Sequence, residues 1–142
     1  MNFLLDTNVV SEWIKPRPDA NVIRWLAEAD EDRVFLSVAS IAEIRRGIEL
    51  LPTGRRRESL EHWLGDDLAQ RFEHRIIDIT VPVAHAWGVM LARAQKTGFA
   101  LGSMDAFFAA TARTHNMTLV TRNVRDYVRL EIELLNPWAS GK

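Results

Sequence analysis

The chain has 142 residues, of which 47% are hydrophobic and 26% are charged, and its formal net charge is −1. This length suits one domain with its own core, so we expect residues 1–142 to fold as a single unit, and the near-neutral charge excludes a general binder of polyanions. The absence of cysteine excludes disulfides, thiolate metal ligands and a cysteine nucleophile.

Short apolar runs, typical of buried strands, alternate with helical patterns along the chain. The runs expected to form strands are residues 2–5, 34–37, 76–79 and 118–120, with a less apolar fifth at 131–135. The segments expected to form helices are a short one ending near residue 14, then 19–29, 38–51, 56–73, 82–98 and 103–115. Asp19 and Ser103 suit the N-caps of two of these helices. Strands separated by helices predict an α/β fold, with a parallel sheet and helices on both faces.

The chain shows no signal for membrane insertion. No apolar run approaches the ~20 residues of a membrane span. The N-terminus lacks a basic region, and Asp6 and Glu12 interrupt the apolar stretch that a signal peptide would need. The sequence therefore predicts a cytoplasmic protein without a membrane partner.

Three acidic side chains stand where a charge needs an explanation. Asp6 ends the first apolar run, Glu43 lies in a helical stretch of small and apolar residues, and Asp105 begins a helix rich in Phe and Ala. A buried carboxylate is costly unless it is paired, hydrogen-bonded or bound to a metal. If the three converge, they make a site for a hard cation such as Mg²⁺, and such a site supports metal-assisted phosphodiester hydrolysis.

Each acid also has a simpler interpretation. Asp6, followed by Thr7 and Asn8, would suit the N-cap of a helix. Glu43 lies off the apolar stripe of its helix and would suit a solvated position. Asp105 would interact favourably with a helix dipole. The apolar stripe beside Glu43 consists of Ile41, Ile44, Ile48 and Leu51.

The basic residues and the known motifs add less. Arginine accounts for 15 of the 18 basic residues, which favours phosphate contacts but also follows from a GC-rich genome. The sequence contains no H-E-x-x-H zinc motif, no G-x-S-x-G nucleophile elbow and no glycine-rich phosphate loop.

Several segments together carry a family resemblance that covers essentially the whole chain. They are residues 3–8 (FLLDTN), 40–44 (SIAEI), 103–106 (SMDA) with 109–112 (AATA), 119–127 (LVTRNVRDY) and 136–138 (NPW). Through them the chain resembles PIN-domain proteins, and among these the toxin ribonucleases of VapBC-type modules, especially their FitB-like branch. The resemblance implies a three-layer α/β/α fold around a parallel sheet of about five strands.

The resemblance also assigns the site. By matching position, Asp6, Glu43 and Asp105 are the three core acids of the family. A fourth acid often follows the late strand, but this position is Asn123 here, with Asp126 three residues further on. The fourth group therefore stays open: Asn123 would offer a carbonyl oxygen to the metal or orient a water, and Asp126 would either reach the site or only cap the short turn.

The implied activity is that of an endoribonuclease that depends on Mg²⁺ or Mn²⁺. Asp6 and Asp105 are expected to bind the metal directly, and Glu43 to bind it through water or to orient the attacking water. The residues expected to hold the RNA backbone are Arg46, Arg122 and Arg125.

The implied partners are a cognate antitoxin, operator DNA bound only through that antitoxin, and a second copy of the chain in a homodimer. Two other interpretations stay open. One is a structure-specific DNA nuclease that uses the same chemistry. The other is a catalytically silent binding module with the PIN fold.

Overall fold

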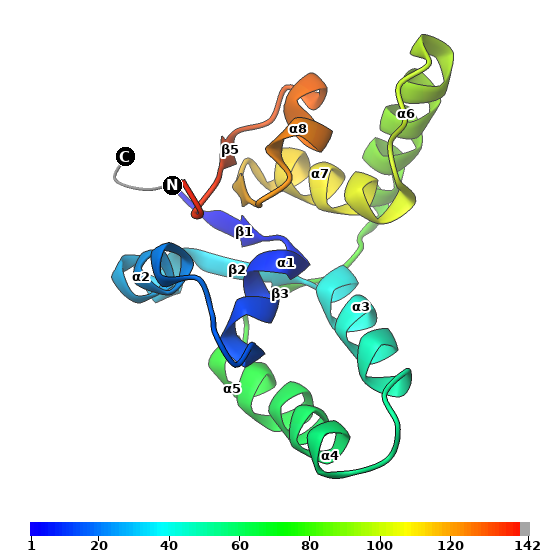
Figure 1. The fold of residues 1–142 in the computed structure, drawn as a ribbon. Coiled ribbons are helices and arrows are strands. Elements are labelled where there is room, and N and C mark those ends of the chain that lie inside the picture. Colours follow the sequence, from blue (N-terminus) through cyan, green and yellow to red (C-terminus); the bar gives the residue numbers. More distant parts are fainter. Residues whose placement is uncertain (140–142) are drawn as a thin grey trace.

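Residues 1–139 are described by a computed structural model (Figure 1). Its centre is a five-stranded sheet in which every neighbouring pair is parallel and the strand order is β3-β2-β1-β4-β5. The strands are β1 (Phe3–Leu5), β2 (Val34–Ser37), β3 (Ile76–Ile77), β4 (Thr118–Val120) and β5 (Leu134–Leu135). Helices cover both faces of the sheet, which confirms the predicted three-layer α/β/α fold.

The first strand of the chain lies in the middle of this sheet. In register, Phe3 lies opposite Val34 of β2 and Thr118 of β4. Leu4 and Leu5 are both fully buried because successive side chains of a strand enter opposite layers, and each belongs to a different core. The carboxyl ends of parallel strands share one edge of the sheet, which we call the carboxyl edge.

The first half of the chain supplies the helices of the Leu5 layer. They are α1 (Thr7–Val10), η1 (Ser11–Ile14), α2 (Ala20–Glu28), η2 (Glu31–Arg33), α3 (Val38–Glu49), α4 (Arg55–His62), η3 (Trp63–Leu68) and α5 (Ala69–Arg71). The second half supplies α6 (Val81–Thr97), α7 (Ser103–His115), α8 (Val124–Tyr127) and η4 (Val128–Leu130). Helices α6 and α7 pack against each other and cover Leu4.

Most predicted boundaries are confirmed to within two residues, as is the capping role of Asp19, whose carboxylate accepts the backbone N–H groups of Asn21 and Val22. Three expectations were wrong. The helix expected at 56–73 changes to π-helical geometry in η3. Gly102, not Ser103, is the N-cap of α7, because Ser103 is already helical. The third and fifth strands are only two residues long.

The fifth strand is short for a local reason. Glu131 adopts a left-handed conformation, with a φ of 56°, and directly follows the turn η4. Extended pairing therefore resumes only at Leu134. Within residues 1–139, no helix combines the length and apolar character that crossing a membrane would require.

Candidate active site

Asp6 is held at the carboxyl edge by the central strand. Its backbone N–H donates to the carbonyl of Val120 at 2.9 Å, which continues the pairing of β1 with β4. Its side chain is only 6% exposed. One carboxylate oxygen accepts the backbone N–H of Thr7 at 2.7 Å, and the other accepts the hydroxyl of Thr121 at 2.8 Å. The fold thus fixes the orientation of this carboxylate.

Tyr127 joins Asp6 to Asp105. Its fully buried side chain places the phenol hydroxyl 2.9 Å from Oδ1 of Asp105 and 3.3 Å from Oδ2 of Asp6. The structure therefore brings together two of the predicted site acids, one from the end of β1 and one from the first turn of α7. Sequence reasoning missed the role of this tyrosine. The sequence offered only a weak signal, which is that the single tyrosine of the chain follows the late strand closely, next to Asp126.

The environment of Asp6 disfavours its charge. Burial raises the pKa of Asp6 to about 6, against the lowering effect of the hydrogen bonds from Thr121, Thr7 and Tyr127, and the negative charge of Asp105 raises it further. Burial, and then the two carboxylates, raise the pKa of the Tyr127 phenol far above its ordinary value. Tyr127 is therefore a neutral hydrogen-bond donor at any physiological pH.

The buried acid Glu12 provides a contrast. It is 2% exposed, but Lys15 and the backbone N–H of Asp19 donate hydrogen bonds to it. Burial acts to raise the pKa of Glu12, yet these bonds and the charge of Lys15 lower it overall. Within residues 1–139, no salt bridge involves Asp6 or Asp105. Among the described residues, Asp6 and Asp105 therefore lack a cationic partner such as the one that Glu12 has in Lys15.

Glu43 lies on the other side of Asp6, on α3. The hydroxyl of Thr7 donates to Oε1 of Glu43 and lies 3.0 Å from the hydroxyl of Ser40, which is fully buried. Thr7 follows Asp6 directly, so this one residue links Asp6 to Glu43 through its hydroxyl. Glu43 is half-buried and not fully solvated. The predicted apolar stripe agrees with this placement, since Ile44 and Ile48 are buried.

The structure does not connect the two candidates for a fourth group to the acids through their side chains. Asn123 is exposed and offers no side-chain cap to α8, although its backbone N–H donates to the hydroxyl of Thr121 at 3.0 Å. Asp126 is also exposed, and its backbone N–H donates to the carbonyl of Asn123.

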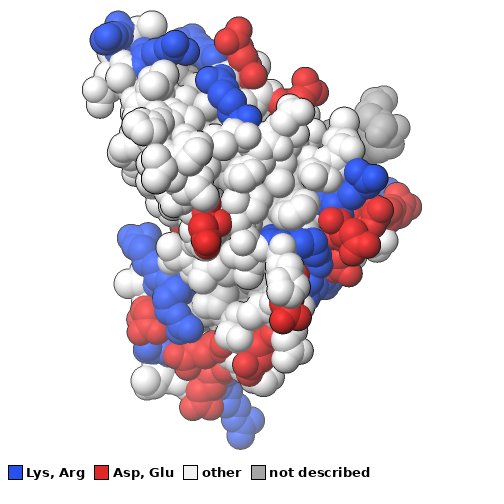
Figure 2. All heavy atoms as spheres, turned by 180° about the vertical axis from the view of Figure 1, so that it is seen from behind, with Lys and Arg blue, Asp and Glu red and all other residues white. Residues whose placement is uncertain are grey.

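Of the three arginines expected to bind RNA, Arg122 has contacts that fix its place at the carboxyl edge. Its backbone N–H donates to Oδ1 of Asn8 at 3.4 Å, and its guanidinium lies 5.3 Å from the ring centroid of Trp138. Arg46 and Arg125 are exposed. Figure 2 shows basic and acidic side chains intermixed on the face seen from behind, beside a broad uncharged area. Contacts between that face and a polyanion would therefore be confined to small groups of basic side chains.

The acids suit a cation that takes only one or two of its ligands from the protein. Among residues 1–139, no group of three Asp, Glu, His or Cys side chains is arranged to enclose one ion. Mg²⁺, however, usually takes one or two carboxylates and completes its shell with water and substrate phosphate. Asp6 and Asp105 would supply two oxygen ligands of the type that Mg²⁺ prefers, and a nearby cation would favour the charged form of Asp6, which burial disfavours.

Replacing Tyr127 with Phe should leave the repulsion between the carboxylates of Asp6 and Asp105 without the compensating hydrogen bonds. The ring would still fill its buried position, but the donor to both acids would be lost. We expect the free energy of unfolding to fall by about 1 kcal/mol at pH 8. The loss should be smaller at pH 5, where Asp6 is protonated. Urea denaturation at both pH values measures it, and an equal loss at both would show that the effect does not depend on the charge of Asp6.

The chain is similar to known proteins along nearly its whole length. A family model, the PIN domain, matches residues 3–131. Toxin FitB of Neisseria gonorrhoeae is 33% identical over 95% of this chain and 97% of FitB. VapC ribonuclease Y4jK of Sinorhizobium fredii is 29% identical over 95% of this chain and 96% of its own length. The solved structure of FitAB bound to an IR36 DNA fragment matches with a TM-score of 0.91 and 32% identity, covering 99% of this chain and 98% of the other.

Proposed function

The chain belongs to the PIN-domain family, and from this premise we propose that it is the nuclease toxin of a toxin–antitoxin module and hydrolyses RNA with the help of Mg²⁺ or Mn²⁺. The observation that carries the proposal is the buried carboxylate of Asp6, with its pKa raised to about 6, next to Asp105 and without a cationic partner among the described residues. Strongly perturbed acids of this kind are typical of functional sites. The names of the relatives, a toxin and a ribonuclease, point to the same activity.

We assign a separate role to each residue of the proposed site. Asp6 and Asp105 would hold the cation, and Glu43 would bind it through water or orient the attacking water. When bound, the cation lowers the pKa of a water and neutralises charge on the scissile phosphate. Thr121 and the backbone N–H of Thr7 keep the carboxylate of Asp6 in one orientation.

Two further hydroxyls position the other acids. Tyr127 holds Asp105 through a hydrogen bond, and Thr7 holds Glu43 in the same way. Such outer contacts fix the direction of a metal-binding oxygen and are as much part of a metal site as the ligands. Arg122, whose backbone N–H donates to Asn8, would hold a phosphate of the RNA, and we assign Arg46 and Arg125 to more distant phosphates.

Partners follow from the same premise. The similar FitAB structure is bound to a DNA fragment, and FitB is a toxin, so we assign to this chain a cognate antitoxin through which it reaches operator DNA. An antitoxin side chain of positive charge, inserted between Asp6 and Asp105, would supply the missing cation and block the site. We further propose that the toxin is a homodimer, and sedimentation as a monomer at micromolar concentration would contradict this.

The proposal predicts cleavage of RNA by the purified chain without its antitoxin. A panel of structured RNAs should be cut in Mg²⁺ or Mn²⁺ and left intact in EDTA. Competition with single-stranded DNA of matched sequence separates an RNA nuclease from a DNA nuclease, because only RNA should compete for the site. Cleavage of DNA in preference to RNA would contradict the proposed substrate.

A second candidate is a catalytically silent binding module. It is favoured by the exposed position of Asn123 where the family often has an acid, and by the lack of a three-acid cluster among residues 1–139. In that case the acids would serve only to receive a basic side chain of the partner. Calorimetry that shows antitoxin binding but no Mn²⁺ binding would favour this candidate.

A further inference from the structure

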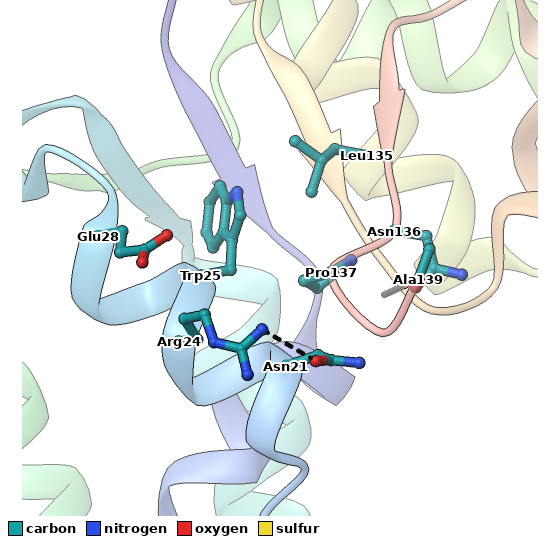
Figure 3. A pocket seen from close by; sticks show the side chains of 8 residues that line it. All are labelled: Asn21, Arg24, Trp25, Glu28, Leu135, Asn136, Pro137 and Ala139. Carbon is teal, nitrogen blue, oxygen red and sulfur yellow. Dashed lines mark hydrogen bonds between the residues drawn. The ribbon is translucent and has the colours of Figure 1, made fainter. Parts of the chain in front are cut away.

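A hollow of about 490 Å³ lies between helix α2 and the segment that follows β5 (Figure 3). Its volume falls within the range of small-molecule sites, about 300–1,000 Å³. Leu135 ends β5, and the segment after it begins at the carboxyl edge, the same edge that carries the acids. We call it the α2 hollow.

The walls of the α2 hollow suit a flat ring. Trp25 lines one side, and Leu135 and Pro137 line the other. The indole of Trp25 is half-buried and packs edge-on against Phe3, with ring centroids 5.2 Å apart and an interplanar angle of 87°. Its orientation is therefore fixed before any ligand arrives. Aromatic side chains of this kind are the surfaces on which proteins stack unpaired bases.

Polar groups at the rim offer both kinds of hydrogen-bonding partner. Glu28 is exposed and forms no salt bridge within residues 1–139, so its carboxylate is an available acceptor. Asn136 accepts the backbone N–H of Trp138 through its oxygen at 2.9 Å, which leaves its amide nitrogen as a donor. Arg24 donates to Oδ1 of Asn21 at 3.3 Å, and this contact holds its guanidinium beside the hollow (Figure 3).

A chain of direct contacts links the α2 hollow to the acids. The amide nitrogen of Asn21 donates to the carbonyl of Trp138 at 3.2 Å, and the ring of Trp138 lies against the guanidinium of Arg122. Arg122 directly follows Thr121, whose hydroxyl donates to Asp6. Arg122, the residue proposed to hold a phosphate of the RNA, is thus connected to the hollow through Trp138.

We propose that the α2 hollow binds an unstacked base of the RNA substrate and that guanine is the base it fits best. The inference rests on the proposed nuclease function. Guanine presents two adjacent N–H donors on its Watson–Crick edge, which match the two oxygens of the Glu28 carboxylate in a charge-assisted pair. Uracil presents a single ring N–H between two carbonyls, and adenine and cytosine each place an acceptor nitrogen beside their amine, which the carboxylate repels.

Binding of free nucleotides to the metal-free protein tests the proposal without any cleavage. The chain has five tryptophans, so a ¹⁵N-labelled sample gives few indole N–H signals, and Trp25→Phe identifies the one from Trp25. GMP should shift the Trp25 signal at lower concentration than AMP, CMP or UMP. Glu28→Gln should weaken GMP binding about tenfold and leave AMP binding unchanged. Glu73→Gln, an exposed glutamate outside the lining of the hollow, is the matched control and should change nothing.

The outcomes separate this proposal from the proposed function. A Trp25 signal that does not move at millimolar GMP would overturn the base site, as would shifts confined to Trp138. Equal affinity for the four nucleotides would overturn the preference for guanine. Asp6→Asn should bind GMP as the wild type does, because Asp6 does not line the hollow. A protein that binds GMP at Trp25 but cuts no RNA would support the base site and contradict only the nuclease.

Discussion

Asp6→Asn should reduce metal-dependent RNA cleavage at least about a thousandfold, which corresponds to the several kcal/mol that a bound metal ion contributes to the transition state. The substitution keeps the shape of the side chain. The amide oxygen can still accept the N–H of Thr7, and the hydroxyls of Thr121 and Tyr127 can turn to accept from the amide nitrogen. What is lost is one negative charge at the metal. Initial rates on the best RNA of the panel measure the effect.

Two comparisons make this result specific. Asp105→Asn should cause a loss of similar size, because the two carboxylates share the hydroxyl of Tyr127 and would share the cation. Asp32→Asn replaces an exposed aspartate in η2, before β2, and should leave the rate unchanged. Normal cleavage by a folded Asp6→Asn protein would contradict the mechanism. Asp126→Asn and Asn123→Ala, assayed alongside, decide whether either residue supplies a fourth group.

The same substitution should stabilise the protein in the absence of metal. The pKa of Asp6 is about 6 in the folded state and near 3.8 when unfolded, so the folded state binds this proton more tightly. Stability from this group is therefore complete below pH 4 and is lost as the pH rises through about 6. A shift of about two pKa units corresponds to about 3 kcal/mol. Asn carries no charge at any of these pH values and avoids the loss.

We expect Asp6→Asn to raise the free energy of unfolding by about 1–3 kcal/mol at pH 7.5 and by nearly nothing at pH 4. Urea denaturation in EDTA at the two pH values gives both numbers. Added Mn²⁺ should then stabilise the wild type and not the variant, because only the wild type has the full charge of the site. A variant that is less stable than the wild type at pH 7.5 would show that the hydrogen bonds of Asp6 outweigh its desolvation.

The architecture was predictable because each strand is an apolar run bounded by helical patterns. The alternation of strands and helices predicted the parallel sheet, and Asp19 predicted the start of α2. The prediction that Ser103 is the N-cap of α7 was wrong because serine suits both an N-cap and a first turn, and the local sequence does not decide between the two positions. The π-helical turn in η3 carries Leu64 and Leu68, which are buried in the core, and no local sequence pattern indicated this change of helical geometry.

The acids of the candidate site could be singled out from the sequence, whereas the residues that hydrogen-bond to them could not. Asp6 and Asp105 could be identified because each is a charge in an apolar context. Tyr127 could not, because its hydroxyl meets the two acids only after β4 and α8 have brought the end of the chain back to β1. The link between Thr7 and Glu43 also spans two elements that are distant in sequence. Single positions reveal residue chemistry, whereas bridging contacts depend on the tertiary fold.

The central position of β1 has a consequence for the synthesis of this protein. Asp6 leaves the ribosome long before β4 and Tyr127, which complete its surroundings, because Tyr127 follows it by 121 residues in the chain. A nascent chain that ends before residue 118 has β1 with one unpaired edge and no assembled site. Translation therefore delays assembly of the proposed site until β4 and Tyr127 have been made, and a product that ends before them would lack this site and would carry the kind of unpaired strand edge that favours aggregation.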